Sequence, residues 1–79
     1  MLEDQDENRL IDRRKTHVRF AGFLTAITEG HLRIAKLFDL LGEHDAADLY
    51  GSSAERSGVA ANYHKTRRIE INAELRKRR

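Results

Sequence analysis

Four histidines are the side chains of this chain best suited to hold a metal ion or to move a proton: His17, His31, His44 and His64. A metal site on one helix needs ligands three or four residues apart, and no second histidine stands at that distance from any of the four. We therefore expect no metal site and no cofactor. We interpret His17 as a boundary histidine that is satisfied by Glu70 on a neighbouring helix.

Other groups that drive catalysis are missing from the sequence. The chain has no cysteine, so it has no thiol nucleophile, and it has no glycine-rich phosphate-binding loop. The serines 52, 53 and 57 stand among small residues, where they are expected to pack rather than react. We expect a protein that is not an enzyme.

The composition predicts one all-α domain over residues 1–79. Charged residues make up 35% of the chain, and proline is absent. Residues 1–7 are mostly acidic and are expected to be frayed, and residues 76–79 form a basic tail. No apolar run approaches 18 residues, and the acidic start does not resemble a secretory signal. We expect a cytoplasmic protein without a membrane partner.

Apolar residues from Leu10 onward recur at steps of three and four, which is the spacing of one helix face. We expect a first long helix over about residues 8–41. One stripe of this helix consists of Leu10, His17, Phe20, Leu24, Ile27, His31, Ile34, Phe38 and Leu41, with Arg13 filling a gap. A second stripe consists of Ile11, Val18, Ala21, Thr25, Leu32 and Ala35. Both stripes keep their phase through Gly22 and Gly30, so we expect the helix to continue through these glycines.

A turn is predicted at Leu41-Gly42-Glu43. Glycine after the last periodic residue is a common end of a helix, because it adopts the left-handed conformation without strain. Asp45 then takes the position of an N-cap, and a second helix is expected over about residues 45–77. Because the loop is so short, the two helices should pack antiparallel as a helical hairpin.

The stripe of the second helix is built largely of small residues in its first half. It consists of Ala47, Tyr50, Ala54, Ser57, Ala61, His64, Arg68, Ile71 and Leu75. Small residues allow a bulky neighbouring helix to approach closely. We expect this stripe to face the first helix.

Residues 31–54 resemble the helix-turn-helix unit of a tetratricopeptide repeat. Ile34, Ala35, Phe38, Gly42, Ala47, Tyr50 and Ala54 fall at spacings similar to the small and aromatic positions of that family. The resemblance covers one repeat, under a third of the chain, and it departs at His31, where the family has a large residue such as tryptophan. It also lacks the closing proline. The resemblance implies similar helix packing and a role in protein binding.

One neighbouring helix cannot cover both apolar stripes of the first helix. An uncovered patch of several hundred Å² is unusual on a monomer, so we expect a homodimer that forms a four-helix bundle. The expected face for self-association or for a partner protein consists of Ile11, Val18, Leu24, Ile27, Leu32 and Phe38.

Charge divides the expected hairpin into two ends. The open end, residues 1–20 and 65–79, has twelve basic and seven acidic residues, whereas the turn end has three basic and six acidic residues. The expected function is that of a small self-associating interaction module, such as an adaptor, regulator or inhibitor. The alternative is a nucleic-acid-associated regulator with a polyanion patch of Arg13, Arg14, Lys15, Lys65, Arg67 and Arg68.

Overall fold

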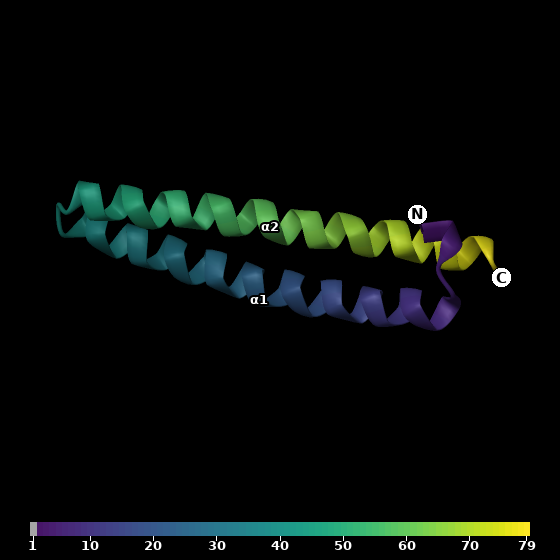
Figure 1. The fold of residues 1–79 in the computed structure, drawn as a ribbon. Helices are drawn as coiled ribbons and strands as arrows, with labels where there is room; N and C mark the ends of the chain where they lie inside the picture. The colour runs from purple at the N-terminus through teal and green to yellow at the C-terminus, as the bar shows by residue number, and fades with distance from the viewer. Residues whose placement is uncertain (1) are drawn as a thin grey trace.

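The computed structural model describes residues 2–79 and shows a hairpin of two helices (Figure 1). Helix α1 spans Glu7–Leu40 and helix α2 spans His44–Lys77, with 34 residues each, and a short 3-10 helix η1 spans Leu2–Asp4. The helices lie side by side and antiparallel, so both ends of the chain lie at the open end of the hairpin (Figure 1). The molecule measures 56 × 16 × 14 Å. The prediction of an antiparallel helical hairpin over about 8–41 and 45–77 is confirmed.

The start of α1 is fixed by a side-chain cap. The Asp6 carboxylate accepts a hydrogen bond of 2.7 Å from the backbone N–H of Arg9, which has no partner inside the helix. From there α1 continues without a break through Gly22 and Gly30, as expected from the phase of its stripes. Within the segment 1–7, which we expected to be frayed, Leu2 belongs to η1 and packs against the hydrophobic core.

The turn depends on the backbone conformation of Gly42. Its φ is +79°, the left-handed region that glycine adopts without strain. The N–H of Glu43 donates to the carbonyl of Phe38 at 2.8 Å, and the N–H of Gly42 donates to the carbonyl of Asp39 at 3.0 Å. These two bonds form a Schellman motif, which satisfies carbonyls at the end of α1. The prediction for Gly42 is confirmed.

The beginning of α2 differs from the prediction. Its N-cap is Glu43, whose side chain makes no capping bond, and Asp45 lies inside the first turn. The N-cap prediction for Asp45 was therefore wrong. The reason is that Gly42 reverses the chain within one residue, so helical hydrogen bonding already starts with the N–H of Ala47 donating to the carbonyl of Glu43 at 3.0 Å.

The large buried side chains of the described residues gather at the open end. Leu10, Ile71 and Leu75 form this core, and Leu2 and Ile11 pack against it. Elsewhere along the contact between the helices, the fully buried residues are alanines, namely Ala21, Ala47, Ala54 and Ala61. Every member of the stripe predicted for α2 is buried or half-buried. The second helix thus faces α1 as expected, but it contributes little apolar volume over most of its length.

The contact line on α1 follows alternate members of the stripe that begins at Leu10: Leu10 is buried, and His17, His31 and Phe38 contact His64 or Tyr50 of α2. The members between them lie at the flank of this contact, since Phe20 stacks on His64 but is 50% exposed and Leu41 is 74% exposed. The contact line also passes through the buried Ala21 and through Thr28, which bonds to α2. Short side chains occupy much of the narrow space between the helices, and several longer apolar side chains lie at its flank.

Candidate interaction face and histidine pair

Polar pairs connect the two helices along their contact line. Arg14 donates a hydrogen bond of 3.1 Å to Asn72, and the hydroxyl oxygens of Thr28 and Ser57 lie 2.6 Å apart. Between these pairs, Nδ1 of His17 lies 2.8 Å from Nδ1 of His64, so one of the two rings donates to the other. A hydrogen-bonded pair tolerates little shift between the helices, so these contacts fix the register of the hairpin.

The partner of His17 is therefore His64 and not Glu70, as the sequence had suggested. Glu70 accepts a hydrogen bond of 2.6 Å from Arg67 within α2. The prediction was wrong because it matched residues by equal distance from the turn, whereas His64 comes six residues before Glu70.

The surroundings of His17 favour its neutral form. The pKa of His17 is lowered mainly by burial. The neighbouring positive charges of His64, Arg13 and Arg67 lower it further. Tyr63 also lies beside the ring, at a centroid distance of 6.3 Å, and brings no negative charge to it. Within residues 2–79, no group of three or more histidine, cysteine, aspartate or glutamate side chains is arranged to hold a metal ion.

We expect the folded hairpin to lose stability as the pH falls below about 6.5, the ordinary pKa of histidine. The unfolded chain then binds a proton at His17, while the folded chain resists it because its His17 pKa is lower. The stabilisation is complete above pH 6.5 and decreases as the pH falls towards the lowered pKa. Urea unfolding followed by circular dichroism from pH 7.5 to 5.0 measures this dependence.

Substitutions at two histidines separate this effect from general acid effects. His17→Asn is expected to flatten the slope of stability against pH, whereas His44→Asn is expected to retain it. His44 is the matched control because it lies on the surface beside the turn, where its Nδ1 is 3.0 Å from Asp39. An unchanged slope in His17→Asn would contradict the role of the histidine pair.

Another heptad stripe on α1, distinct from the two described above, lies beside the contact line and is largely left uncovered by α2. Phe20, Phe23, Leu37 and Leu41 of this stripe are exposed, and Ile27 and Ile34 are half-buried. Its members follow alternating steps of three and four residues, which place them on one side of the helix. The stripe consists of Phe20, Phe23, Ile27, Gly30, Ile34, Leu37 and Leu41.

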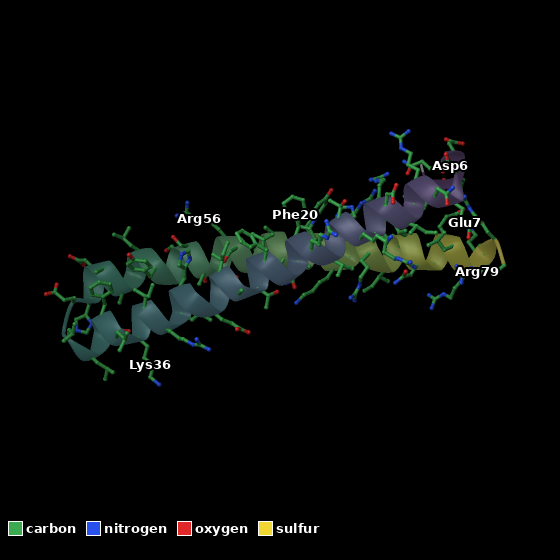
Figure 2. All side chains as sticks on the ribbon, turned by 90° about the horizontal axis from the view of Figure 1, so that it is seen from below. Asp6, Glu7, Phe20, Lys36, Arg56 and Arg79 are labelled. Atoms are coloured by element: carbon green, nitrogen blue, oxygen red, sulfur yellow. The ribbon has the colours of Figure 1, made fainter. Side chains whose placement is uncertain are left out.

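Helix α2 extends this apolar surface on the same side. Phe20 stacks on His64 at a centroid distance of 5.2 Å, and the neighbouring Tyr63 is exposed. The exposed Leu49 stands two heptads before Tyr63, and Arg56 stands midway between them. Figure 2 shows Phe20 and Arg56 projecting to the same side of the hairpin and Lys36 projecting to another. We call the α1 stripe together with Leu49 and Tyr63 the apolar face.

The residues expected to form the partner face are divided by the structure. Leu24, Ile27 and Phe38 are half-buried, and Phe38 stacks on Tyr50 at a centroid distance of 5.6 Å. Ile11 packs on the core at the open end, so it belongs to the hairpin itself.

Val18 and Leu32, the exposed members of that expected set, lie on the other side of α1. Two residues correspond to about 200° of helix rotation, so Val18 and Phe20 point in nearly opposite directions. Val18 and Leu32 line shallow grooves with small residues such as Ala21, Ala35 and Gly51.

Sequence reasoning missed Phe23 and Leu37, which are both exposed on the apolar face. A signal for them existed, because Phe23 stands three residues after Phe20 and Leu37 three residues after Ile34, which are both members of the predicted stripe that begins at Leu10. Apolar spacing alone did not decide which of several overlapping stripes meets α2.

The six basic residues expected to form one polyanion patch are also divided. Arg14 bonds to Asn72, and Arg67 bonds to Glu70. Arg13 lies close enough to His17 to affect its pKa. By contrast, Lys65 and Arg68 line the groove beside Val18, on the other side of the hairpin, and Lys15 is exposed. Arg13 and Arg67 thus lie near His17, whereas Lys65 and Arg68 line the groove beside Val18.

Within residues 2–79, neither long helix has a segment apolar enough to cross a membrane. Searches against protein family models, curated proteins and solved structures found no match to this chain. The resemblance to a tetratricopeptide unit therefore stays a prediction.

Proposed function

We propose that this chain is a non-catalytic helical interaction module that associates with itself through the apolar face and forms a four-helix bundle. The observation that supports this proposal is an imbalance in the hairpin. Eleven large apolar side chains of the described residues are exposed, whereas only Leu10, Ile71 and Leu75 are large and fully buried. The hairpin alone therefore leaves most of its large apolar side chains in water.

The dimensions of the apolar face are consistent with such an interface. The stripe from Phe20 to Leu41 is about 32 Å long at the rise of an α-helix, and the hairpin is 16 Å wide. The projected area is thus on the order of 500 Å², at the upper end for patches on monomers. Since accessible area exceeds projected area, the face is comparable to the roughly 800 Å² that each partner buries in a standard interface.

A role as adaptor or regulator follows from what this dimer leaves exposed. The opposite side, with the shallow grooves beside Val18 and Leu32, stays open when the apolar face is covered. Small residues on that side permit the close approach of a helix from another protein. We propose this side for the second, protein-binding part of the function.

The dimer is tested by replacing one exposed leucine on the apolar face. Leu37 is 60% exposed in the single hairpin, and Leu37→Asp would place two carboxylates inside a symmetric interface. Loss of two buried leucines raises the dissociation constant on the order of a hundredfold or more. Light scattering and sedimentation equilibrium across micromolar concentrations are expected to show a dimer for the natural chain and a monomer for the variant.

Leu32→Asp is the matched control. Leu32 lies on the same helix and is 53% exposed, but it belongs to the opposite side. This variant is expected to remain a dimer, and the helical circular dichroism signal of both variants should match that of the natural chain. A monomeric natural chain would refute the proposal. Loss of the dimer in Leu32→Asp but not in Leu37→Asp would also contradict it, because the interface would then lie on the side of Val18 and Leu32.

The nucleic-acid alternative has weaker support. Arg14 and Arg67, two of its six basic residues, are engaged by side chains of the same hairpin. The remaining basic side chains lie on different sides, so a single phosphate backbone would not contact them together. The apolar face therefore gives the stronger argument for function.

A further inference from the structure

We infer that the occupant of the apolar face is a second copy of this chain in the antiparallel orientation, with the two-fold axis passing beside Gly30. The inference rests on the proposed self-association and adds its geometry. In this arrangement each α1 lies along the α1 of the second copy, and the two turns point in opposite directions. The parallel arrangement would instead place α1 against α2 of the second copy, with both turns at the same end.

The apolar face is complementary to itself in the antiparallel orientation. Its stripe is centred on Gly30, with three apolar residues before it and three after it. Rotation about a two-fold axis at this centre brings Phe20 to Leu41 of the second copy and Phe23 to Leu37 of the second copy. Ile27 then meets Ile34 of the second copy, so aromatic rings from one half pack on aliphatic side chains from the other.

The distribution of charge favours the same orientation. The open end has five more basic than acidic residues, and the turn end has three more acidic than basic residues. A parallel dimer would bring the two basic ends together and the two acidic ends together. The antiparallel dimer places the acidic turn of one copy, with Glu43, near the basic region of the other copy that includes Arg67.

Gly30 is explained by this arrangement and not by the hairpin alone. A Cβ built on Gly30 meets nothing within 4 Å, so the contact with α2 does not require a glycine there. Gly22 and Gly51 are equally open, so only its place in the stripe distinguishes Gly30. At the centre of an antiparallel pair, the missing side chain allows the two α1 helices to approach closely, which offsets the low helix propensity of glycine.

Single cysteines test the orientation directly, since the chain has no natural cysteine. Gly30→Cys is expected to form a covalent dimer in high yield upon mild oxidation or with a short bismaleimide, because each residue 30 lies beside its own copy. Gly22→Cys is the matched control, an equally open glycine of α1 outside the stripe, and is expected to stay largely monomeric in denaturing electrophoresis. The yield of Gly30→Cys should exceed that of the control by about tenfold.

A mixed pair gives a second measurement if the added side chain at residue 30 weakens the dimer. Ile27→Cys and Ile34→Cys are expected to cross-link when mixed and to give little product separately. Cross-linking in both experiments supports the antiparallel dimer. If the natural chain is dimeric by light scattering but the cysteine variants give neither product, the orientation alone is refuted. A monomeric natural chain refutes the proposed self-association as well.

Discussion

Replacing Ile71 by alanine is expected to destabilise the hairpin by about 2–5 kcal/mol, the usual range for a large aliphatic side chain cut to alanine inside a core. Ile71 is fully buried and packs with Leu10 and Leu75 at the open end. Because these three are the large, fully buried side chains of the described residues, few other contacts compensate for the cavity. A small domain has only a few kcal/mol of net stability, so the variant should be largely unfolded near 37 °C.

Ile69→Ala is the control for this substitution. Ile69 lies two residues earlier on α2 and is 56% exposed, so its truncation removes few contacts. Both substitutions exchange isoleucine for alanine inside the same helix, so the gain in helix propensity is shared and cancels in the comparison. Thermal and urea unfolding at one protein concentration should place Ile69→Ala within about 0.5 kcal/mol of the natural chain. Equal losses in the two variants would contradict the core described here.

The fold was predictable wherever a residue or a pattern of residues is compatible with only one local structure. Gly42 ends α1 because a positive φ suits glycine, and its position gave the turn and the lengths of both helices. The stripe of α2 was predictable because its members repeat with a heptad spacing and, apart from His64 and Arg68, are small, apolar or aromatic. Each of these features depends on neighbours along the chain, which a sequence displays directly.

The face of α1 that meets α2 was not predictable in the same way. Apolar residues cover so much of α1 that several stripes have a helical spacing, and the choice depends on which side chains fit between the helices. Ala21 and Thr28 decide it, because short side chains allow close approach and the Thr28 hydroxyl finds Ser57. The pairing of His17 with His64 depends on that same choice. The apolar face could therefore be located only after the contact line was known.

Folding and association use different residues in this arrangement. The large side chains that hold the hairpin together lie at the open end, whereas the apolar face extends from Phe20 towards the turn. Ile71→Ala should therefore unfold the chain, whereas Leu37→Asp should dissociate a chain that remains helical. Between the two regions, the close contact of the helices depends on buried alanines, and these alanines set the distance between α1 and α2.

Leucine in place of Ala54 is expected to destabilise the hairpin by about 1–3 kcal/mol through overpacking. Ala54 is 3% exposed, and its carbonyl accepts a hydrogen bond of 3.1 Å from Ser57, which also contacts Thr28. A larger side chain would push α1 away and separate the Thr28 and Ser57 hydroxyls. Urea unfolding measures the loss of stability. Amide hydrogen exchange should also become faster around residues 28 and 57.

Ala73→Leu is the control, since Ala73 lies exposed on the same helix. The added leucine there should change stability by no more than about 0.5 kcal/mol, because nothing lies in its path. If Ala54→Leu were as stable as this control, the alanines would not set the helix separation, and the polar pairs alone would have to fix it. A loss confined to Ala54→Leu means that small residues hold the helices close, which displaces the large apolar side chains of α1 to the face that remains open for a second copy.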